Sequence, residues 1–290
     1  DYTATINVSS NDPDEYNISV PVILIVGADM NVQITVEHYE DWNMVGLPLI
    51  VEDTSVMSVF PDAVENTMYL FGENGYEQEQ NLELGSGYWV RFDEQGSNTI
   101  FGEFVYTVDV SLMEHWNMIS GGSVSGGVFI DPSELIVPNT LYSFTENGYD
   151  NANSIEPGLG YWIRSYGNGL ITISSGGGSA KLAGQGHTIL KNANTISFNG
   201  SSLYFGIQIP EKDILSYSLP PKPPLGSFDV RFADDTKIMD NYGMIEIMNG
   251  SDQLLISYNM NIAPEQNSEW ILESMSTHEQ FTLSEKGNIE

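Results

Sequence analysis

The chain has 290 residues, of which 41% are hydrophobic and 11% aromatic, enough for two or three domains with buried cores. It carries 40 acidic residues against 9 basic ones, a formal net charge of −31. Nucleic acids and anionic membrane surfaces are excluded as partners, because both are bound by clustered Lys and Arg side chains. The lack of cysteine excludes disulfides and thiolate chemistry. No apolar run is long enough for a membrane-spanning helix, so we expect no membrane insertion.

The charge is distributed unevenly along the chain. Residues 1–180 contain 26 acidic side chains but only two basic ones, Arg91 and Arg164. Residues 181–290 contain 14 acidic and seven basic side chains. Residues 174–179 are rich in Ser and Gly, a composition typical of a flexible linker. Together these two features predict a domain boundary between the two parts.

Two strands are predicted at the start of the chain. Residues 2–8 alternate between polar and apolar side chains, and residues 18–26 are mostly apolar. We therefore expect residues 1–28 to form an N-terminal hairpin or the closing strands of an immunoglobulin-like module. Because the sequence begins inside a strand pattern, we expect it to be a fragment of a longer protein.

The turn between these two strands concentrates carboxylates. Asp12, Asp14 and Glu15 place three oxygen ligands close together, and such ligands suit Ca²⁺. No known calcium-loop spacing is present, so a solvated polar turn is the alternative reading. Calcium at this turn is the one cofactor that we consider.

Residues 29–107 and 108–180 contain the same sequence pattern twice. The offset between the copies is 73 positions over most of the pattern and 74 at its upstream Trp-Asn-Met segment. A repeat of this length is typical of one small domain used in series. We therefore predict two tandem β repeats. The matching segments are 42–45 with 116–119, 67–76 with 140–149, and 85–91 with 158–164.

Helical periodicity is scarce, and short helical turns are predicted only at 54–60 and 132–136. Residues 181–290 contain further short strand patterns, which predict a C-terminal β-sandwich domain. Within it, residues 219–224 are Pro-rich and predict polyproline II backbone. Many short strands separated by turns indicate an all-β fold, made of tandem small β-sandwich or immunoglobulin-like modules with short helical turns.

The repeated Gly-x-Gly-Tyr-Trp segment is the first candidate binding site. Alternate side chains of a strand face opposite ways, so Trp89 shares a face with Arg91, and Trp162 shares one with Arg164. A Trp ring beside a guanidinium stacks on sugars or binds carboxylates, which predicts a polysaccharide or glycoprotein site. Alternatively, the tryptophans fill the core and each arginine pairs with a partly buried carboxylate.

Tyr76 and Tyr149 are further candidate ligand-binding residues. Both lie in the repeated Glu-Asn-Gly-Tyr segment, and Asn-Gly suits a tight turn with positive φ. Each tyrosine either contacts a ligand from an exposed loop or closes over the edge of the core.

No catalytic signature is present in the sequence. The four histidines lack metal-ligand spacing, and there is no nucleophile elbow, phosphate-binding loop or dinucleotide fingerprint. A glycosidase-type carboxylate pair has no discriminating value among 40 acidic residues. We therefore predict that the chain is not an enzyme.

The two repeats resemble a known family. Segments 42–48, 70–76 and 85–89, with their counterparts in the second copy, are similar to repeats of the form Gly-Trp-Asn…Leu-Tyr-x-Phe…Gly-Tyr…Pro-Gly-x-Gly-Tyr-Trp. Such repeats occur in large secreted proteins of Bacteroidetes-related bacteria. Asp41 and His115 stand where those repeats have a glycine before the first Trp.

The flanking segments resemble modules from the same context. Residues 9–26 look like the closing strands of immunoglobulin-like modules that precede such repeats. Residues 217–232 are similar to the module that comes just before a C-terminal type IX secretion sorting tail. The resemblance implies a secreted or surface-attached β-rich stalk or accessory region.

Three functions are consistent with these observations. The first is a non-catalytic extracellular scaffold that spaces, anchors or assembles surface structures and contacts other domains of its parent protein. The second is an adhesion module that binds polysaccharide or glycoprotein through the repeated Trp, Tyr and Arg residues. The third is a filament subunit that self-associates by strand addition at residues 1–26, because unpaired strand edges template such pairing. Exposed Trp89 and Trp162 would favour binding, and buried ones the scaffold.

Overall fold

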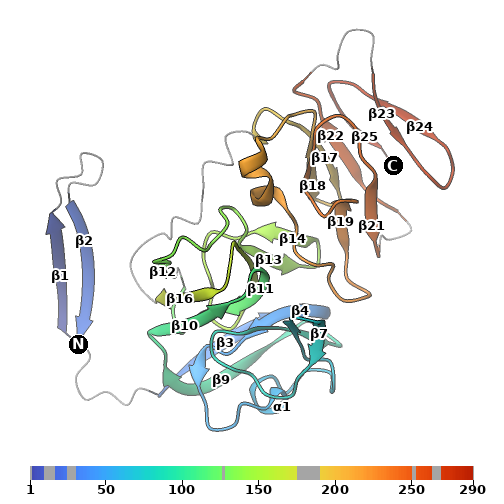
Figure 1. Cartoon of the computed structure of the whole chain (residues 1–290). Helices are drawn as coiled ribbons and strands as arrows, with labels where there is room; N and C mark the ends of the chain where they lie inside the picture. Colours follow the sequence, from blue (N-terminus) through green and yellow to red (C-terminus); the bar gives the residue numbers. More distant parts are fainter. Residues whose placement is uncertain are drawn as a thin grey trace.

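The computed structural model describes residues 2–9, 17–24, 31–125, 128–174, 190–249, 253–262 and 269–289. Strands make up 51% of the chain and helices 5%, which confirms the predicted all-β fold. The strands form several small, mostly antiparallel sheets rather than one large sheet (Figure 1).

The N-terminal segment forms a two-stranded hairpin. Strands β1 (Tyr2–Ser9) and β2 (Asn17–Leu24) pair antiparallel along their whole length. The acidic turn with Asp12, Asp14 and Glu15 lies outside the described residues, so the calcium site stays a prediction.

Residues 31–104 form a unit of two small sheets. Its elements are β3 (Asn31–His38), β4 (Asp41–Gly46), β5 (Leu49–Ile50), α1 (Val56–Val59), β6 (Tyr69–Gly72), β7 (Gly75–Gln78), β8 (Gly87–Phe92) and β9 (Gly96–Phe104). One sheet has the strand order β3-β9-β5 and the other β4-β8-β6-β7. Side chains from both sheets and from α1 form one buried core, which includes Val36, Val59, Val90 and Ile100.

Residues 107–174 repeat this arrangement strand for strand. The elements are β10 (Thr107–Leu112), β11 (His115–Ser120), β12 (Val128–Ile130), β13 (Tyr142–Thr145), β14 (Gly148–Asn151), β15 (Gly160–Ser165) and β16 (Gly169–Ser174). The two sheets have the orders β10-β16-β12 and β11-β15-β13-β14, so each strand takes the place of its counterpart in the first repeat. The duplicated sequence is therefore a duplicated fold.

The second repeat has no helix where α1 lies in the first, so the helical turn predicted at 132–136 is wrong. The carboxylate of Asp131 accepts hydrogen bonds from the backbone amides of Leu135 and Ile136, each at 2.8 Å. Glu134 has a left-handed φ of 49°. Because a side chain takes the place of the helical backbone acceptors, the segment turns instead of coiling.

The asparagine of the repeated Trp-Asn pair stabilises a hairpin turn. The side chain of Asn43 accepts a hydrogen bond from the amide of Tyr39 at 2.9 Å. It also donates to the carbonyls of Tyr39 at 2.8 Å and Asp41 at 3.1 Å. Asn117 makes the same three bonds in the second copy. In both repeats this buried amide joins the two strands that precede the aromatic segment.

The two repeats face each other across an approximate two-fold axis. The amide of Gly46 donates to the carbonyl of Gly158 at 3.0 Å, and the amide of Ser120 donates to that of Gly85 at 2.9 Å. These bonds are equivalent, because Ser120 is the counterpart of Gly46 and Gly158 that of Gly85. The two units thus lie side by side as a pseudo-symmetric pair (Figure 1).

The second glycine of each Gly-x-Gly-Tyr-Trp segment allows this close approach. A Cβ on Gly87 would lie 2.7 Å from the carbonyl oxygen of Ile119, and one on Gly160 would lie 2.8 Å from that of Val45. Any side chain at these positions would push the two repeats apart. Gly87 and Gly160 therefore allow the two repeats to pack closely against each other.

Residues 190–289 form the C-terminal unit. Its elements are β17 (Asn194–Phe198), β18 (Ser201–Phe205), the 3₁₀ helix η1 (Glu211–Tyr217), β19 (Asp229–Phe232), β20 (Ile238–Met239), β21 (Ile245–Met248), β22 (Ile256–Asn259), β23 (Trp270–Glu273), β24 (Gln280–Leu283) and β25 (Lys286–Ile289). The largest sheet has the order β20-β18-β17-β22-β25 and packs with β19-β21 and β23-β24 around a core that includes Phe198, Leu203 and Val230.

Candidate functional site

An aromatic cluster fills the axis between the two repeats. It forms because strands alternate: Tyr88 and Val90 of β8 face the core of their own repeat, whereas Trp89 faces the other repeat. Trp162 on β15 does the same from the opposite side, and both tryptophans are 0% exposed. The cluster consists of Trp42, Met44, Tyr69, Phe71, Trp89, Trp116, Met118, Tyr142, Phe144, Tyr149, Trp162 and Leu219.

The aromatic contacts across the axis are symmetric. The Trp89 ring meets Phe144 edge-on at 4.7 Å between centroids, and the Trp162 ring meets Phe71 at 5.0 Å. Each contact joins one repeat to the other, and edge-to-face packing of this kind suits buried aromatic pairs. The predicted alternative in which the tryptophans fill a core is the one observed, except that the core lies between the repeats.

Aromatic donors around this cluster hold a segment of the C-terminal unit. The hydroxyl of Tyr76 donates to the carbonyl of Lys222 at 3.0 Å, and that of Tyr149 donates to the carbonyl of Pro221 at 2.8 Å. Two further bonds extend the row on either side. They run from Tyr142 to the carbonyl of Ser218 at 3.2 Å and from the Trp42 indole to the carbonyl of Leu225 at 3.0 Å. We call these four side chains the aromatic cradle and residues 218–225 the proline segment.

The proline segment has the features of polyproline II backbone. Ser218 at its start has φ −68° and ψ 148°, close to the values of that conformation. Pro220 and Pro223, three residues apart, are both buried, which matches the three-residue turn of a polyproline II helix. Such a helix makes no internal hydrogen bonds, so its carbonyls are free to accept from side chains. An aromatic groove with hydroxyl and indole donors fits it well.

A buried arginine supports the proline segment from the C-terminal unit. The guanidinium of Arg231 is 0% exposed and binds Asp229 through two bonds of 2.6 and 2.9 Å. It also donates to Asp235 at 2.8 Å and to the carbonyl of Pro220 at 2.8 Å. Burial lowers the pKa of Arg231, but its hydrogen bonds to Asp229 and Asp235 outweigh the effect of burial and leave the pKa raised. Nothing in the sequence pattern distinguishes Arg231 from the other basic residues of the C-terminal unit.

The hydroxyls of Tyr76 and Tyr149 in the cradle stay neutral donors. Burial raises the pKa of Tyr149 well above its usual value, with a smaller contribution from the nearby Tyr76 hydroxyl. Burial likewise raises the pKa of Tyr76. Since only the neutral form of a phenol donates, the raised pKa values match the role of both hydroxyls.

The predicted Trp–Arg platform is not an open surface in this structure. Arg91 pairs with Asp41 at 3.1 Å, and both side chains are about half exposed. In the second repeat His115 occupies the position of Asp41, and Arg164 instead lies 5.7 Å from the centre of the Trp116 ring. Burial lowers the pKa of Arg164. Each arginine lies on the same strand as its buried Trp, but its partners differ between the copies.

Of the six predicted ligand-binding residues, the structure brings four together at the axis. They are Tyr76, Trp89, Tyr149 and Trp162, and they contact one another or the proline segment. Tyr142 and Trp42 belong to the same site. Their role was not predicted from the sequence, because the pattern of a single strand does not show which segment packs against that strand.

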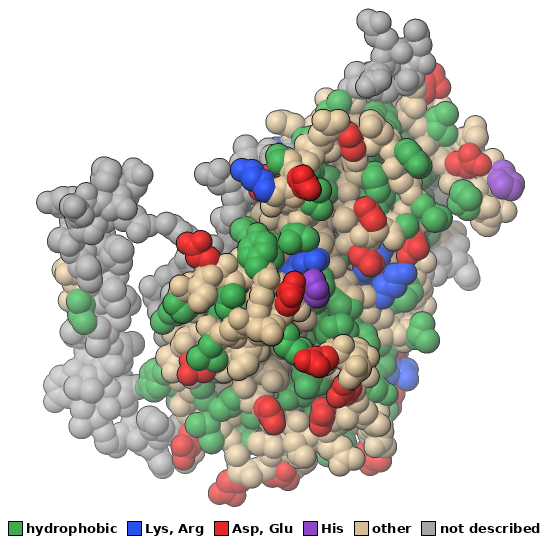
Figure 2. Space-filling view, in the orientation of Figure 1, with side chains coloured by type: hydrophobic (Ala, Val, Ile, Leu, Met, Phe, Trp, Pro, Cys, Tyr) green, Lys and Arg blue, Asp and Glu red, His purple; other side chains and the backbone are tan. Residues whose placement is uncertain are grey.

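Acidic side chains are scattered widely over the molecular surface, and basic ones are few on the face drawn in Figure 2. Within the described ranges, no group of three or more His, Asp or Glu side chains is arranged to hold a metal ion. Among the same residues, no helix is both long and apolar enough to cross a bilayer.

No family model, curated protein or solved structure matches the chain. The resemblance of the repeats to those of secreted bacterial proteins therefore stays a prediction. What the site can do is argued below from its own contacts.

Proposed function

We propose that this chain is a non-catalytic structural region that holds a C-terminal unit in a fixed position on a rigid pair of repeats. The observation that carries the proposal is the aromatic cradle, which grips the proline segment by hydrogen bonds to four of its carbonyls. Each such bond contributes about 0.5–1.5 kcal/mol. Together with burial of Leu219 in the cluster, they fix three units that a single chain would otherwise join loosely.

The buried tryptophans support a structural role over a binding role at this place. Trp89 and Trp162 make contacts only inside the protein within the described residues, and both are 0% exposed. A sugar-binding platform needs an open ring face, which neither indole offers. The cradle, the other aromatic surface of the repeats, is already filled by the proline segment.

The extracellular location of this scaffold rests on the resemblance of the repeats to those of secreted proteins. The strong negative charge suits such a role, because it keeps an assembly of β units soluble and apart from its neighbours. Other domains of a larger parent protein are the natural partners of a spacer of this kind.

Removal of the Tyr76 and Tyr149 hydroxyls tests the proposal. The double variant Tyr76→Phe/Tyr149→Phe keeps both rings but loses both donors to the proline segment. We expect faster amide hydrogen exchange at 218–228, faster proteolysis there, and a larger radius of gyration by small-angle scattering. The control is Tyr106→Phe/Tyr166→Phe, because these rings are 44% and 49% exposed on the repeats. If both double variants behave like the parent in all three measurements, the cradle does not hold the unit and the proposal fails.

Assembly into a filament is a second candidate, favoured by the N-terminal hairpin. Strands β1 and β2 form a sheet of two strands, which is marginally stable alone in water. Strand addition from a second copy would extend it. Sedimentation of the full chain and of a variant lacking residues 1–28 distinguishes the cases. Concentration-dependent assembly that disappears in the shorter chain supports the filament, and monomers at all concentrations exclude it.

A further inference from the structure

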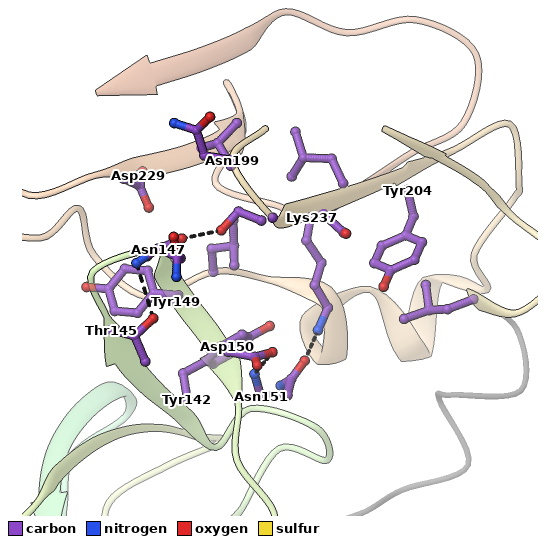
Figure 3. A pocket seen from close by; sticks show the side chains of 18 of the residues that line it. Tyr142, Thr145, Asn147, Tyr149, Asp150, Asn151, Asn199, Tyr204, Asp229 and Lys237 are labelled. Carbon is purple, nitrogen blue, oxygen red and sulfur yellow. Dashed lines mark hydrogen bonds between the residues drawn. The ribbon is translucent and has the colours of Figure 1, made fainter. Parts of the chain in front are cut away.

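A polar cavity of about 440 Å³ lies between the second repeat and the C-terminal unit. Its size is within the range of small-molecule sites. Figure 3 shows that its walls come from β13 and β14 on one side and, on the other, from β18, the turn at 199–200 that precedes it, β19 and Lys237. It lies beside the aromatic cradle, and nothing in the proposed structural role requires it.

The central feature of this cavity is a buried lysine. Lys237 is 7% exposed, and its ammonium group donates to the side-chain oxygen of Asn151. The ammonium also lies 5.0 Å from the centre of the Tyr142 ring. No carboxylate forms an ion pair with Lys237 among the described residues. A buried ammonium has three donors, and burial without an anion is costly.

The nearby carboxylates are engaged elsewhere or open to solvent. Asp229 lines the cavity but is bound by both arms of the Arg231 guanidinium. Asp150 lines it too, and its carboxylate accepts from the backbone amide of Asn151 at 2.8 Å. Asp150 is exposed, so it is free to accept hydrogen bonds from a ligand as well.

Three other polar side chains around the cavity have no hydrogen-bond partner among the described residues. The side-chain amides of Asn147 and Asn153 and the hydroxyl of Tyr204 line it, and none of them makes a hydrogen bond within the described part of the chain. In Figure 3 the Lys237 and Tyr204 side chains extend toward the same region from the C-terminal unit. Amides, a phenol and a carboxylate together suit several hydroxyl groups held at fixed positions.

We propose that this cavity binds a small polyhydroxylated monocarboxylate, such as a single hexuronic acid residue, with its carboxylate on Lys237. The hydroxyls of the sugar pair with Asn147, Asn153, Tyr204 and Asp150. The carboxylate completes the hydrogen bonds of the buried ammonium. Charge-assisted bonds of this kind are about twice as strong as neutral ones.

The net charge of −31 restricts the ligand to a small one. A long polyanion would lie against the acidic surface seen in Figure 2 and be repelled by it. A single carboxylate inside the cavity is shielded from most of that charge, because exposed charges beyond about 10 Å are screened by salt. The ligand is therefore a monosaccharide or the end of a chain, not a stretch of acidic polymer.

Matched ligands test the proposal without any change to the protein. Isothermal calorimetry and ligand-observed NMR on the full chain would compare glucuronate and galacturonate with glucuronamide, which keeps the shape but lacks the charge. We expect at least one acid to bind at least about tenfold more tightly than the amide. Equal affinity for acid and amide would overturn the role of Lys237. A lack of binding by both acids at millimolar concentration would overturn the site.

Two variants locate the bound acid. Lys237→Met removes the charge at similar length and should abolish the preference for acid over amide. Lys212→Met removes an exposed lysine of η1 and should leave that preference unchanged. A preference that survives in Lys237→Met contradicts the proposal. If that variant does not fold, Tyr204→Phe replaces it, and chemical-shift changes at Gly200–Leu203 on adding acid must become weaker.

Discussion

Tyr76 and Tyr149 lie 73 positions apart in the sequence, yet they donate to adjacent carbonyls, those of Lys222 and Pro221. In polyproline II backbone, with three residues per turn, successive carbonyls point about 120° apart. One tyrosine side chain therefore cannot donate to both carbonyls. A groove between two copies of the same unit can bind both carbonyls, because each copy contributes one tyrosine from its own side of the axis. Duplication of the repeat thus creates a site that neither copy has alone.

The first prediction concerns alkaline pH. The pKa of Tyr149 is raised well above its usual value of 10.0 by burial, and burial raises that of Tyr161 to about 12. A group whose pKa is raised on folding contributes stability that is complete below its unfolded pKa and is lost as pH rises through its folded pKa. The contribution of these tyrosines to stability should therefore be constant below about pH 10 and fall steeply above it.

Denaturant unfolding at several pH values, with absorbance at 295 nm to follow tyrosinate, measures this effect. The buried Tyr149 and Tyr161 should ionise only as the protein unfolds. In Tyr149→Phe the slope of stability against pH above pH 10 should be smaller than in the parent. Normal tyrosinate formation by every tyrosine in the folded protein would contradict the prediction.

The second prediction concerns the glycines at the interface of the repeats. Gly87→Ala and Gly160→Ala each place a Cβ within 2.8 Å of a backbone carbonyl of the other repeat. Because backbone must move to relieve the clash, each should cost about 1–3 kcal/mol of unfolding free energy. Gly167→Ala is the matched control, since nothing lies within 4 Å of its added Cβ. Equal melting temperatures for all three variants would show that the repeats do not approach so closely.

Part of this fold can be predicted from the sequence, because the strand period of two is a local property. The alternation at 88–92 correctly separates Tyr88 and Val90 from Trp89, and the repeat at 161–163 does the same. What covers the outward face is not local. The same alternation is consistent with an exposed binding platform and with a buried interface, and only packing between the two repeats decides between them.

The contacts of the proline segment also could not be predicted from local sequence patterns. Its backbone conformation follows from its prolines, but its contact with Tyr76 spans 146 positions. Periodicity carries no information about such a contact. The helical turn predicted at 132–136 failed for a different reason, because Asp131 competes for the amides that a helix would need.

The third prediction concerns the turn before each repeated Trp. Asp41 and His115 have φ values of 69° and 77°, in the left-handed region that favours glycine. A glycine adopts this conformation without the steric cost of a Cβ. His115→Gly should therefore stabilise the chain by up to about 1 kcal/mol.

Asp41→Gly is the paired variant in this test. It gains the same backbone relief but loses the ion pair with Arg91, worth about 0–1 kcal/mol at an exposed site. We therefore expect a smaller gain than for His115→Gly. Thermal melts in low and high salt measure both, and the gap between the variants should narrow in high salt. A destabilised His115→Gly would mean that its side chain makes a contact that outweighs the strain.

The fourth prediction separates the buried arginine from the exposed one. Arg231→Met leaves Asp229 buried, at 3% exposed, without its cation. It also removes the donor to Pro220 beneath the proline segment. Loss of one partner of a buried ion pair costs about 3–5 kcal/mol. Arg91→Ala, which removes a half-exposed partner of Asp41, should cost no more than about 1 kcal/mol.

The double variant Asp229→Asn/Arg231→Met shows why the single one is costly. If the cost comes from the uncompensated carboxylate, removing that charge as well should recover part of the lost stability. If it comes from the lost bond to Pro220, the double variant should be as unstable as the single one, with hydrogen exchange at 218–225 fast in both. Urea unfolding of the parent and of these three variants separates the two causes, and a cost for Arg231→Met as small as that for Arg91→Ala would refute both.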